Sequence, residues 1–168
     1  QIAASLLVAH GCEVGGIDVA PAKVKRALDR GAVAGAVVGQ DDCVEVVRAA
    51  SAGKGADAVV ITASSDTSSP LVLAGDLARD RARISVVGLL PLQVPRKTYY
   101  EKELSLLVSR SYGPGRYDPA YEEGGSDYPI GYVRWTEARN LEAVLTAIAR
   151  RRLDVASLIT HRFPFESA

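Results

Sequence analysis

The stretch that decides the fold is A-V-V-I-T at Ala58–Thr62, a continuous run of apolar and β-branched residues. A run of this kind is typical of a strand that is buried on both faces. A second such run, I-S-V-V-G-L-L at Ile84–Leu90, follows a helical pattern that begins at Pro70. Buried strands that alternate with helices predict a parallel sheet covered on both faces, which is a doubly wound α/β fold.

The same alternation extends to both sides of this region. Apolar periodicity and capping residues predict further helices that begin near residues 2, 21, 42 and 136, with either Asp41 or Asp42 capping the third. The other predicted strands are 12–19, 36–38 and 104–108, followed by an exit strand at 157–165. We expect one domain over residues 1–168, with a core at 1–110 and a terminal helix and exit strand at 135–168.

Residues 110–134 form a loop, punctuated by glycine and proline, that has no clear period. The loop holds five of the seven tyrosines, Tyr112, Tyr117, Tyr121, Tyr128 and Tyr132, and the only tryptophan, Trp135, follows it. Loops of this length are usually functional or form interfaces. We expect this one either to shape a substrate pocket or to contact a partner domain.

Charge excludes several classes of partner. The 168-residue chain has 20 lysines and arginines and 20 aspartates and glutamates, so its net charge at pH 7 is zero. We therefore expect no binding to nucleic acid or to a membrane surface. The most basic run, Arg150–Arg152, is interpreted as the solvated end of a helix. No apolar run approaches the ~18 residues that a membrane span needs.

The cysteines and histidines indicate no metal site. Cys12 and Cys43 lack the spacing of a zinc knuckle or a redox pair, and a reducing, cytoplasmic location is expected. His10 and His161 have no other ligand-type residues at metal-binding spacing, so both are expected to be packing or surface residues.

Asp18 is the clearest candidate for a functional residue. It stands at the carboxyl end of the strand at 12–19, where a dinucleotide-binding βαβ unit places an acidic residue that accepts hydrogen bonds from the adenosine ribose. The alternative is a plain cap for the helix that begins at Pro21. The glycine-rich turn should lie about 20 residues before the acidic residue, which places it immediately before Gln1. We therefore expect the chain to lack its first strand and its glycine-rich loop.

The first strand is central in the Rossmann order 3-2-1-4-5-6. Without it, the strands that end at Asp18 and Thr62 are expected not to pair directly. Two further strand ends, at Thr62–Ala63 and Gly88–Leu89, should face the ligand crevice. Gly88 could admit a flat ligand or could only permit the turn into Pro91.

Four motifs together resemble the zinc-type medium-chain alcohol dehydrogenase superfamily, over essentially the whole chain and as its Rossmann-like nucleotide-binding half. They are Asp18 after its strand, G-A-D-A-V-V-I-T at Gly55–Thr62, R-x-S-V-V-G at Arg83–Gly88 and L-I-T-H-R-F-P-F at Leu158–Phe165. The resemblance implies an oxidoreductase that transfers hydride between a nicotinamide cofactor and an alcohol or sugar-like substrate. The catalytic residues and the zinc with its ligands would lie in a separate, missing domain, so none is assigned here and the fragment is expected to be inactive.

The resemblance also implies a set of cofactor-binding residues. Asp18 would bind the ribose with Lys23 nearby, and the other contacts would come from Thr62, Ala63, Gly88, Leu89 and Leu90. A carboxylate at Asp18 would repel a 2′-phosphate, so NAD is expected in preference to NADP. A solvated surface position is the alternative for Lys23.

Two segments, Ser109–Pro119 and Asp127–Trp135, look like a subgroup in which this half is fused to a Gfo/Idh/MocA-type oxidoreductase domain. The partners expected from this resemblance are that second domain and a homo-oligomer. Two other functions stay open: an S-adenosylmethionine-dependent methyltransferase-like domain, which also has an acidic residue after its second strand, and a non-catalytic assembly module.

Overall fold

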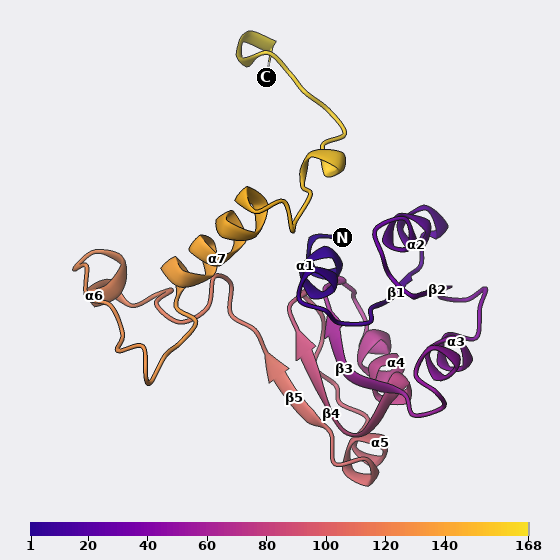
Figure 1. Cartoon of the computed structure of the whole chain (residues 1–168). Helices are drawn as coiled ribbons and strands as arrows, with labels where there is room; N and C mark the ends of the chain where they lie inside the picture. Colours follow the sequence, from indigo (N-terminus) through magenta and orange to yellow (C-terminus); the bar gives the residue numbers. More distant parts are fainter. Residues whose placement is uncertain (168) are drawn as a thin grey trace.

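The computed structural model describes residues 1–167, which form parallel strands separated by helices (Figure 1). The helices are α1 (Ile2–Ala9), α2 (Pro21–Leu28), α3 (Cys43–Ala50), α4 (Ser69–Leu77), α5 (Arg96–Glu101), α6 (Pro119–Glu122) and α7 (Glu137–Ala149). The strands are β1 (Gly15–Asp18), β2 (Ala34–Val37), β3 (Ala56–Ile61), β4 (Ala78–Val86) and β5 (Ser105–Val108). Two turns of 3₁₀ helix lie at Ala156–Leu158 and Phe165–Ser167.

Local capping explains where the early helices begin and end. Asp42 caps α3, since its Oδ1 accepts hydrogen bonds from the backbone N–H groups of Val44 and Glu45, both at 3.0 Å. Asp41 instead accepts a bond from the Val37 N–H at 2.7 Å, at the end of β2. Gly11, at φ +83°, ends α1 in the left-handed conformation that favours glycine.

The strands form two separate parallel sheets. One has the order β1-β2 and the other the order β3-β4-β5, and within residues 1–167 no strand joins β1 to β3. The expectation that the strands ending near Asp18 and Thr62 do not pair directly is therefore confirmed. The fold is α/β with parallel strands, as in the nucleotide-binding half of a Rossmann-like domain.

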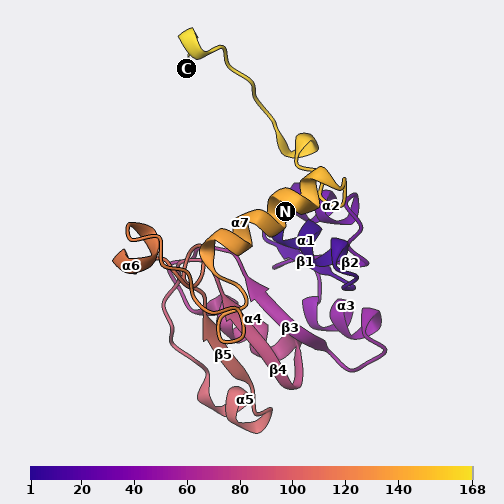
Figure 2. The ribbon, with the colours of Figure 1, turned by 60° about the vertical axis from the view of Figure 1, so that its left-hand side comes forward.

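The main core lies between the larger sheet and α4 with α5. Its buried members are Ile61, Leu71, Ala74, Ile84, Val86, Leu90 and Tyr99. A second cluster connects the two sheets through α3, because Cys43 packs with Ala36 of β2 and Leu77 of α4. In Figure 2, β3, β4 and β5 lie side by side, and α3 lies beside the first strands.

The strand at Ala58–Thr62 is buried on one face only, so the prediction of burial on both faces is wrong. Ile61 is buried against α4, whereas Val60 is 40% exposed. The sheet register aligns Val60 with Ser85 and Leu107, and Leu107 is also exposed. This row lies on the face opposite to the main core because successive residues of a strand point to opposite faces.

β4 begins earlier and ends earlier than the predicted strand at 84–90. Its first six residues, A-R-D-R-A-R, include four charged side chains, and the buried residues of the whole strand are Ala78, Ala82, Ile84 and Val86. The Arg79 guanidinium forms an exposed ion pair with Asp57 of β3 at 2.5 Å, which links the charged part of β4 to the neighbouring strand. An apolar run does not mark this part because only one of its faces is buried.

The predicted exit strand at 157–165 is wrong. The segment contains a 3₁₀ turn at Ala156–Leu158, and within residues 1–167 it has no strand neighbour with which to share hydrogen bonds. The Arg30 guanidinium holds its start by donating to the Asp154 carbonyl at 3.1 Å and to the Ser157 hydroxyl. Beyond it, Phe163 is exposed, and Figure 1 shows this part extending away from the body.

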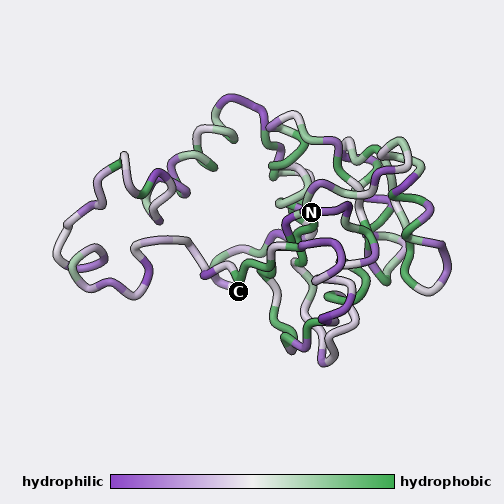
Figure 3. Tube along the Cα trace, turned by 90° about the horizontal axis from the view of Figure 1, so that it is seen from below, coloured by the Kyte–Doolittle hydropathy of each residue, from purple (hydrophilic) through white to green (hydrophobic). Residues whose placement is uncertain are grey.

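Helix α7 is confirmed, but its predicted inward face is only partly covered. Leu141 and Leu145 are 53% and 66% exposed, whereas Val144 and Ile148 are half-buried. Figure 3 shows that the hydrophobic segments gather around the strands, whereas the part that contains α6, projecting to the left, is mostly white and purple. Among the described residues, no helix combines the length and the apolar character needed to cross a membrane.

Because of Tyr99, the free energy of unfolding is expected to fall at alkaline pH. Its hydroxyl donates to the Leu71 carbonyl at 2.9 Å, and burial, with a smaller effect of Asp76, raises the pKa of Tyr99 to about 12. In the unfolded chain the same group ionises near pH 10. The folded state therefore has its full stability below pH 10 and loses about 2 to 3 kcal/mol as the pH rises from 10 through 12.

Urea unfolding at pH 9 and at pH 11.5 checks this prediction. Tyr99→Phe is the comparison, because it removes the titrating group and costs about 1 kcal/mol through the lost hydrogen bond. We expect the variant to lose less stability between the two pH values than the natural chain does. An equal loss in both proteins would assign the pH effect to other groups.

Candidate functional site

Asp18 lies at the end of β1, where one carboxylate oxygen accepts a hydrogen bond and the other forms an ion pair with Lys23. Its Oδ1 accepts a hydrogen bond from the Ala20 N–H at 2.9 Å, and its Oδ2 lies 3.7 Å from Lys23 Nζ. The residue that caps α2 is Ala20, and no side chain caps this helix. Asp18 is therefore not the plain helix cap considered above. Its Oδ2, on a side chain that is 30% exposed, can accept a hydrogen bond from a ligand hydroxyl.

The loops after β3 and β4 lie against each other, which brings Thr62, Ala63, Gly88 and Leu89 together. Val87 and Gly88 both donate their N–H groups to the Ile61 carbonyl, at 2.9 and 3.0 Å. A Cβ on Gly88 would lie 1.9 Å from the Ala63 carbonyl oxygen. Glycine is thus required here by the approach of the neighbouring backbone.

Leu89 and Leu90, the last two residues of the predicted cofactor-binding set, differ in their exposure to solvent. Leu89 is 83% exposed, whereas Leu90 is buried in the main core beside Tyr99. Both border a hollow of about 530 Å³ between the two loops, lined by Ser64, Ser65, Asp66, Leu89, Leu90 and Pro91. Asp18 belongs to the other sheet and does not line this hollow.

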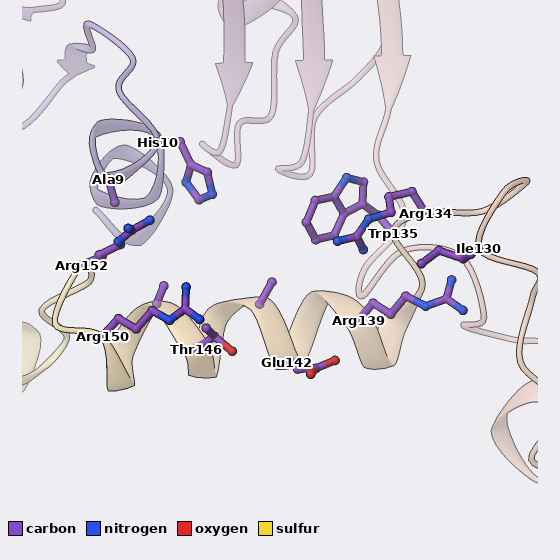
Figure 4. A pocket seen from close by; sticks show the side chains of 12 residues that line it. Ala9, His10, Ile130, Arg134, Trp135, Arg139, Glu142, Thr146, Arg150 and Arg152 are labelled. Carbon is purple, nitrogen blue, oxygen red and sulfur yellow. The ribbon is translucent and has the colours of Figure 1, made fainter.

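A cavity that sequence reasoning missed lies between α1 and α7 (Figure 4). It has a volume of about 430 Å³ and contains Trp135 and four arginines among its lining residues. Two of these arginines, Arg150 and Arg152, belong to the run interpreted as a solvated helix end. The only sequence feature that marks the cavity is the pairing of Trp135 just before α7 with the arginines just after it; nothing local in the sequence indicates that this helix lies against α1.

Four of the five tyrosines of the loop at 110–134 make aromatic or cation–π contacts, whereas Tyr132 is 91% exposed. Tyr121 and Tyr128 stack with ring centroids 5.6 Å apart. The Tyr128 hydroxyl donates to Asp118, which lowers the pKa of that carboxyl and raises the pKa of the tyrosine. Arg116 lies over the rings of Tyr112 and Tyr117. These contacts order a segment that otherwise contains only the short helix α6.

Comparison with protein families identifies the family of the chain. A sequence model described as zinc-binding dehydrogenase matches residues 1–123. The chain belongs to the zinc-binding dehydrogenase family. This membership favours oxidoreductase chemistry over the methyltransferase-like alternative. Among curated proteins, no sequence matches the chain.

Several solved structures share the fold of this chain. Galactitol-1-phosphate dehydrogenase from Escherichia coli superposes with a TM-score of 0.72 and 20% identity, over 98% of this chain and 43% of that one. Alcohol dehydrogenase TADH from Thermus sp. ATN1 gives 0.66 and 20%, over 95% and 40%. Escherichia coli quinone oxidoreductase, complexed with NADPH, gives 0.62 and 21%, over 92% and 43%. The chain thus spans about two fifths of the length of these proteins.

The family name raises the question of whether these residues can hold zinc. Within residues 1–167, no three His, Cys, Asp or Glu side chains are grouped closely enough to hold a metal ion. The His10 ring donates to the Leu6 carbonyl at 2.7 Å, and the His161 ring stacks on Phe163 in the exposed tail. The donors among the described residues do not fit a zinc site, so no chemical step is derived through the metal.

Proposed function

We propose that this chain is the nucleotide-binding part of an NAD-dependent oxidoreductase that acts on an alcohol or sugar-like substrate. The observation that carries the proposal is the partly exposed Asp18 carboxylate at the carboxyl end of a parallel strand, with Oδ2 in an ion pair with Lys23 but in no hydrogen bond within residues 1–167. Ligands of such sheets bind beyond the carboxyl ends of the strands. Membership of a dehydrogenase family supports a nicotinamide cofactor. When bound, that cofactor accepts or donates the hydride.

Each predicted residue has a role in this proposal. Asp18 accepts hydrogen bonds from the hydroxyls of the adenosine ribose, and the Lys23 ammonium flanks the same position. Thr62, Ala63, Gly88 and Leu89 present backbone groups along the cofactor. Leu90, whose side chain is in the core, contributes through its backbone and by holding the loop in place. The negative charge of Asp18 disfavours a 2′-phosphate, so the proposed cofactor is NAD.

The proposal extends to the rest of the protein. Residues 1–168 act as one nucleotide-binding unit that is inactive alone, and the catalytic groups and zinc belong to another domain. A fused Gfo/Idh/MocA-type domain, a homo-oligomer and a cytoplasmic location complete the proposal. The free Cys12 and Cys43 fit a reducing location.

Cofactor titration of the full-length protein tests the role of Asp18. We expect Asp18→Ser to weaken NADH binding by about tenfold, because a charged hydrogen-bond acceptor is lost, and to leave NADPH binding equal or tighter. Fluorescence enhancement of the reduced cofactors gives both dissociation constants. Asp29→Ser is the matched control, since Asp29 is an exposed aspartate at the other end of α2, paired with Lys25.

Three results would contradict the proposal. An unchanged ratio of NADH to NADPH affinity in Asp18→Ser would remove the role of Asp18 in cofactor choice. Binding of S-adenosylmethionine in place of NADH would support the methyltransferase-like function. Binding of neither compound by the natural protein would favour the assembly module.

A further inference from the structure

The cavity between α1 and α7 faces the side of the larger sheet at which ligands are expected. Its lining residues come from the end of α1, from the approach to α7, from α7 itself and from the residues that follow it, and they include Trp135, Arg134, Arg150 and Arg152. The arrowheads of β3, β4 and β5 point toward the side on which α1 and α7 lie (Figures 1 and 2). Parallel sheets bind ligands on this side. A volume of about 430 Å³ is in the range of small-molecule sites.

The cavity has an excess of positive charge. Four arginines line it, against the single carboxylate of Glu142. Arg139 is neutralised by an ion pair with Asp127. Arg134, Arg150 and Arg152 have neither an ion pair nor a side-chain hydrogen bond within residues 1–167. Two of these guanidinium groups, those of Arg150 and Arg152, lie at the same end of the cavity (Figure 4) and can bind one anion, and guanidinium geometry suits phosphate and carboxylate.

The fold itself favours these charges at their positions. Arg150 is the C-terminal cap of α7, and the Arg152 N–H donates to the Ala147 carbonyl at 2.9 Å. The negative end of the helix dipole stabilises cations there without the need for a carboxylate partner. Figure 4 shows Arg150 and Arg152 at one end of the cavity and Arg134, Arg139 and Trp135 at the other.

Trp135 adds a flat surface to this charged cavity. The Arg134 guanidinium lies 4.2 Å from the centre of the indole ring, and half of the tryptophan is exposed. The small side chains of Ala143 and Ala147, on α7, also line the cavity. Aromatic faces pack well against the apolar face of a polyol or sugar chain, and arginines at the rim can bind the negatively charged end of the same ligand.

We propose that this cavity binds the anionic group of the substrate, so that the substrate is an alcohol or polyol that carries a phosphate or a carboxylate. The inference rests on the proposed function and names its substrate class. None of the residues assigned to the cofactor lines the cavity, and it is therefore separate from the adenosine site at Asp18.

Calorimetric titration of the full-length protein with matched probes tests this site. The probes are sorbitol 6-phosphate and gluconate, with sorbitol as the neutral control. We expect the Arg150→Gln/Arg152→Gln double variant to bind the anionic probes about tenfold or more weakly, because two charge-assisted contacts are lost. Arg151→Gln is the matched control, since Arg151 lies between the two arginines but does not line the cavity. It should bind as the natural protein does.

Two further measurements locate the site and distinguish it from the cofactor site. A fluorescence change on binding that disappears in Trp135→Phe would place the probe beside the indole. Asp18→Ser should weaken NADH binding and leave sorbitol 6-phosphate binding unchanged, whereas the double arginine variant should do the reverse. If Asp18→Ser left NADH binding unchanged while the arginine variant lost binding of the anionic probes, the proposed function would be contradicted and the anion site would still be supported.

Several outcomes would overturn the inference. They are binding of sorbitol as tight as that of its phosphate, equal binding by the double variant and Arg151→Gln, or no binding of either anionic probe by the natural protein. Loss of NADH affinity in the double variant would assign these arginines to the cofactor phosphates instead. Circular dichroism checks that the exposed arginine variants remain folded.

Discussion

Replacement of Gly88 by alanine is expected to destabilise the folded chain by about 3 kcal/mol, at the upper end of the cost of overpacking. The new Cβ would lie 1.9 Å from the Ala63 carbonyl oxygen and 3.0 Å from the Thr62 carbonyl carbon. Both contacts are with backbone, which cannot rotate away as a side chain can. The loops after β3 and β4 would have to separate, and the bonds from Val87 and Gly88 to the Ile61 carbonyl would be strained.

Urea unfolding followed by circular dichroism measures this effect. Gly15→Ala is the control, because Gly15 is also in or beside a strand and no atom lies within 4 Å of its added Cβ. We expect that variant to stay within about 0.5 kcal/mol of the natural chain. Equal stabilities for the two variants would show that the loops can part at little cost.

Leu71→Ala is expected to destabilise the chain by about 3 kcal/mol, within the range measured for leucine deletions in protein cores. Leu71 is fully buried on α4, and it packs in the cluster that contains Ile84 and Tyr99. Its neighbours belong to several elements that are fixed by sheet hydrogen bonds, so the cavity would close only in part.

The control for this prediction is Leu145→Ala, the same chemical change on another helix. Leu145 is 66% exposed on α7, so little apolar surface returns to water when it is shortened. The same unfolding experiment should give a loss below about 0.5 kcal/mol for this variant. A large loss in Leu145→Ala would mean that the apolar side of α7 is covered in solution.

Local signals in the sequence were sufficient to predict most elements. The cap at Asp42, the proline at the start of α2 and the glycine after α1 each act within a few residues, so their effects can be read from the chain. The division of the sheet was also predicted, because it follows from the spacing between Asp18 and the expected glycine-rich turn.

The errors came from features that depend on distant parts of the chain. The segment L-I-T-H-R-F-P-F has the composition of a strand, but a strand also needs a neighbour, and this segment has none. The exposure of Val60 likewise could not be predicted, because it depends on which elements pack on that face of the sheet and not on the type of residue. The arginine cavity depends on the return of α7 toward α1, which no local pattern in the chain specifies.

The contact of α3 with both sheets has a consequence for the cooperativity of unfolding. The β1-β2 pair shares no strand hydrogen bonds with the larger sheet, and its packing against it depends on the small cluster around Cys43 and Leu77. Elements that are coupled so weakly can open at a lower free energy than the main core does. A single melting temperature would then average two processes, and amide exchange in β1 and β2 would be faster than in β4.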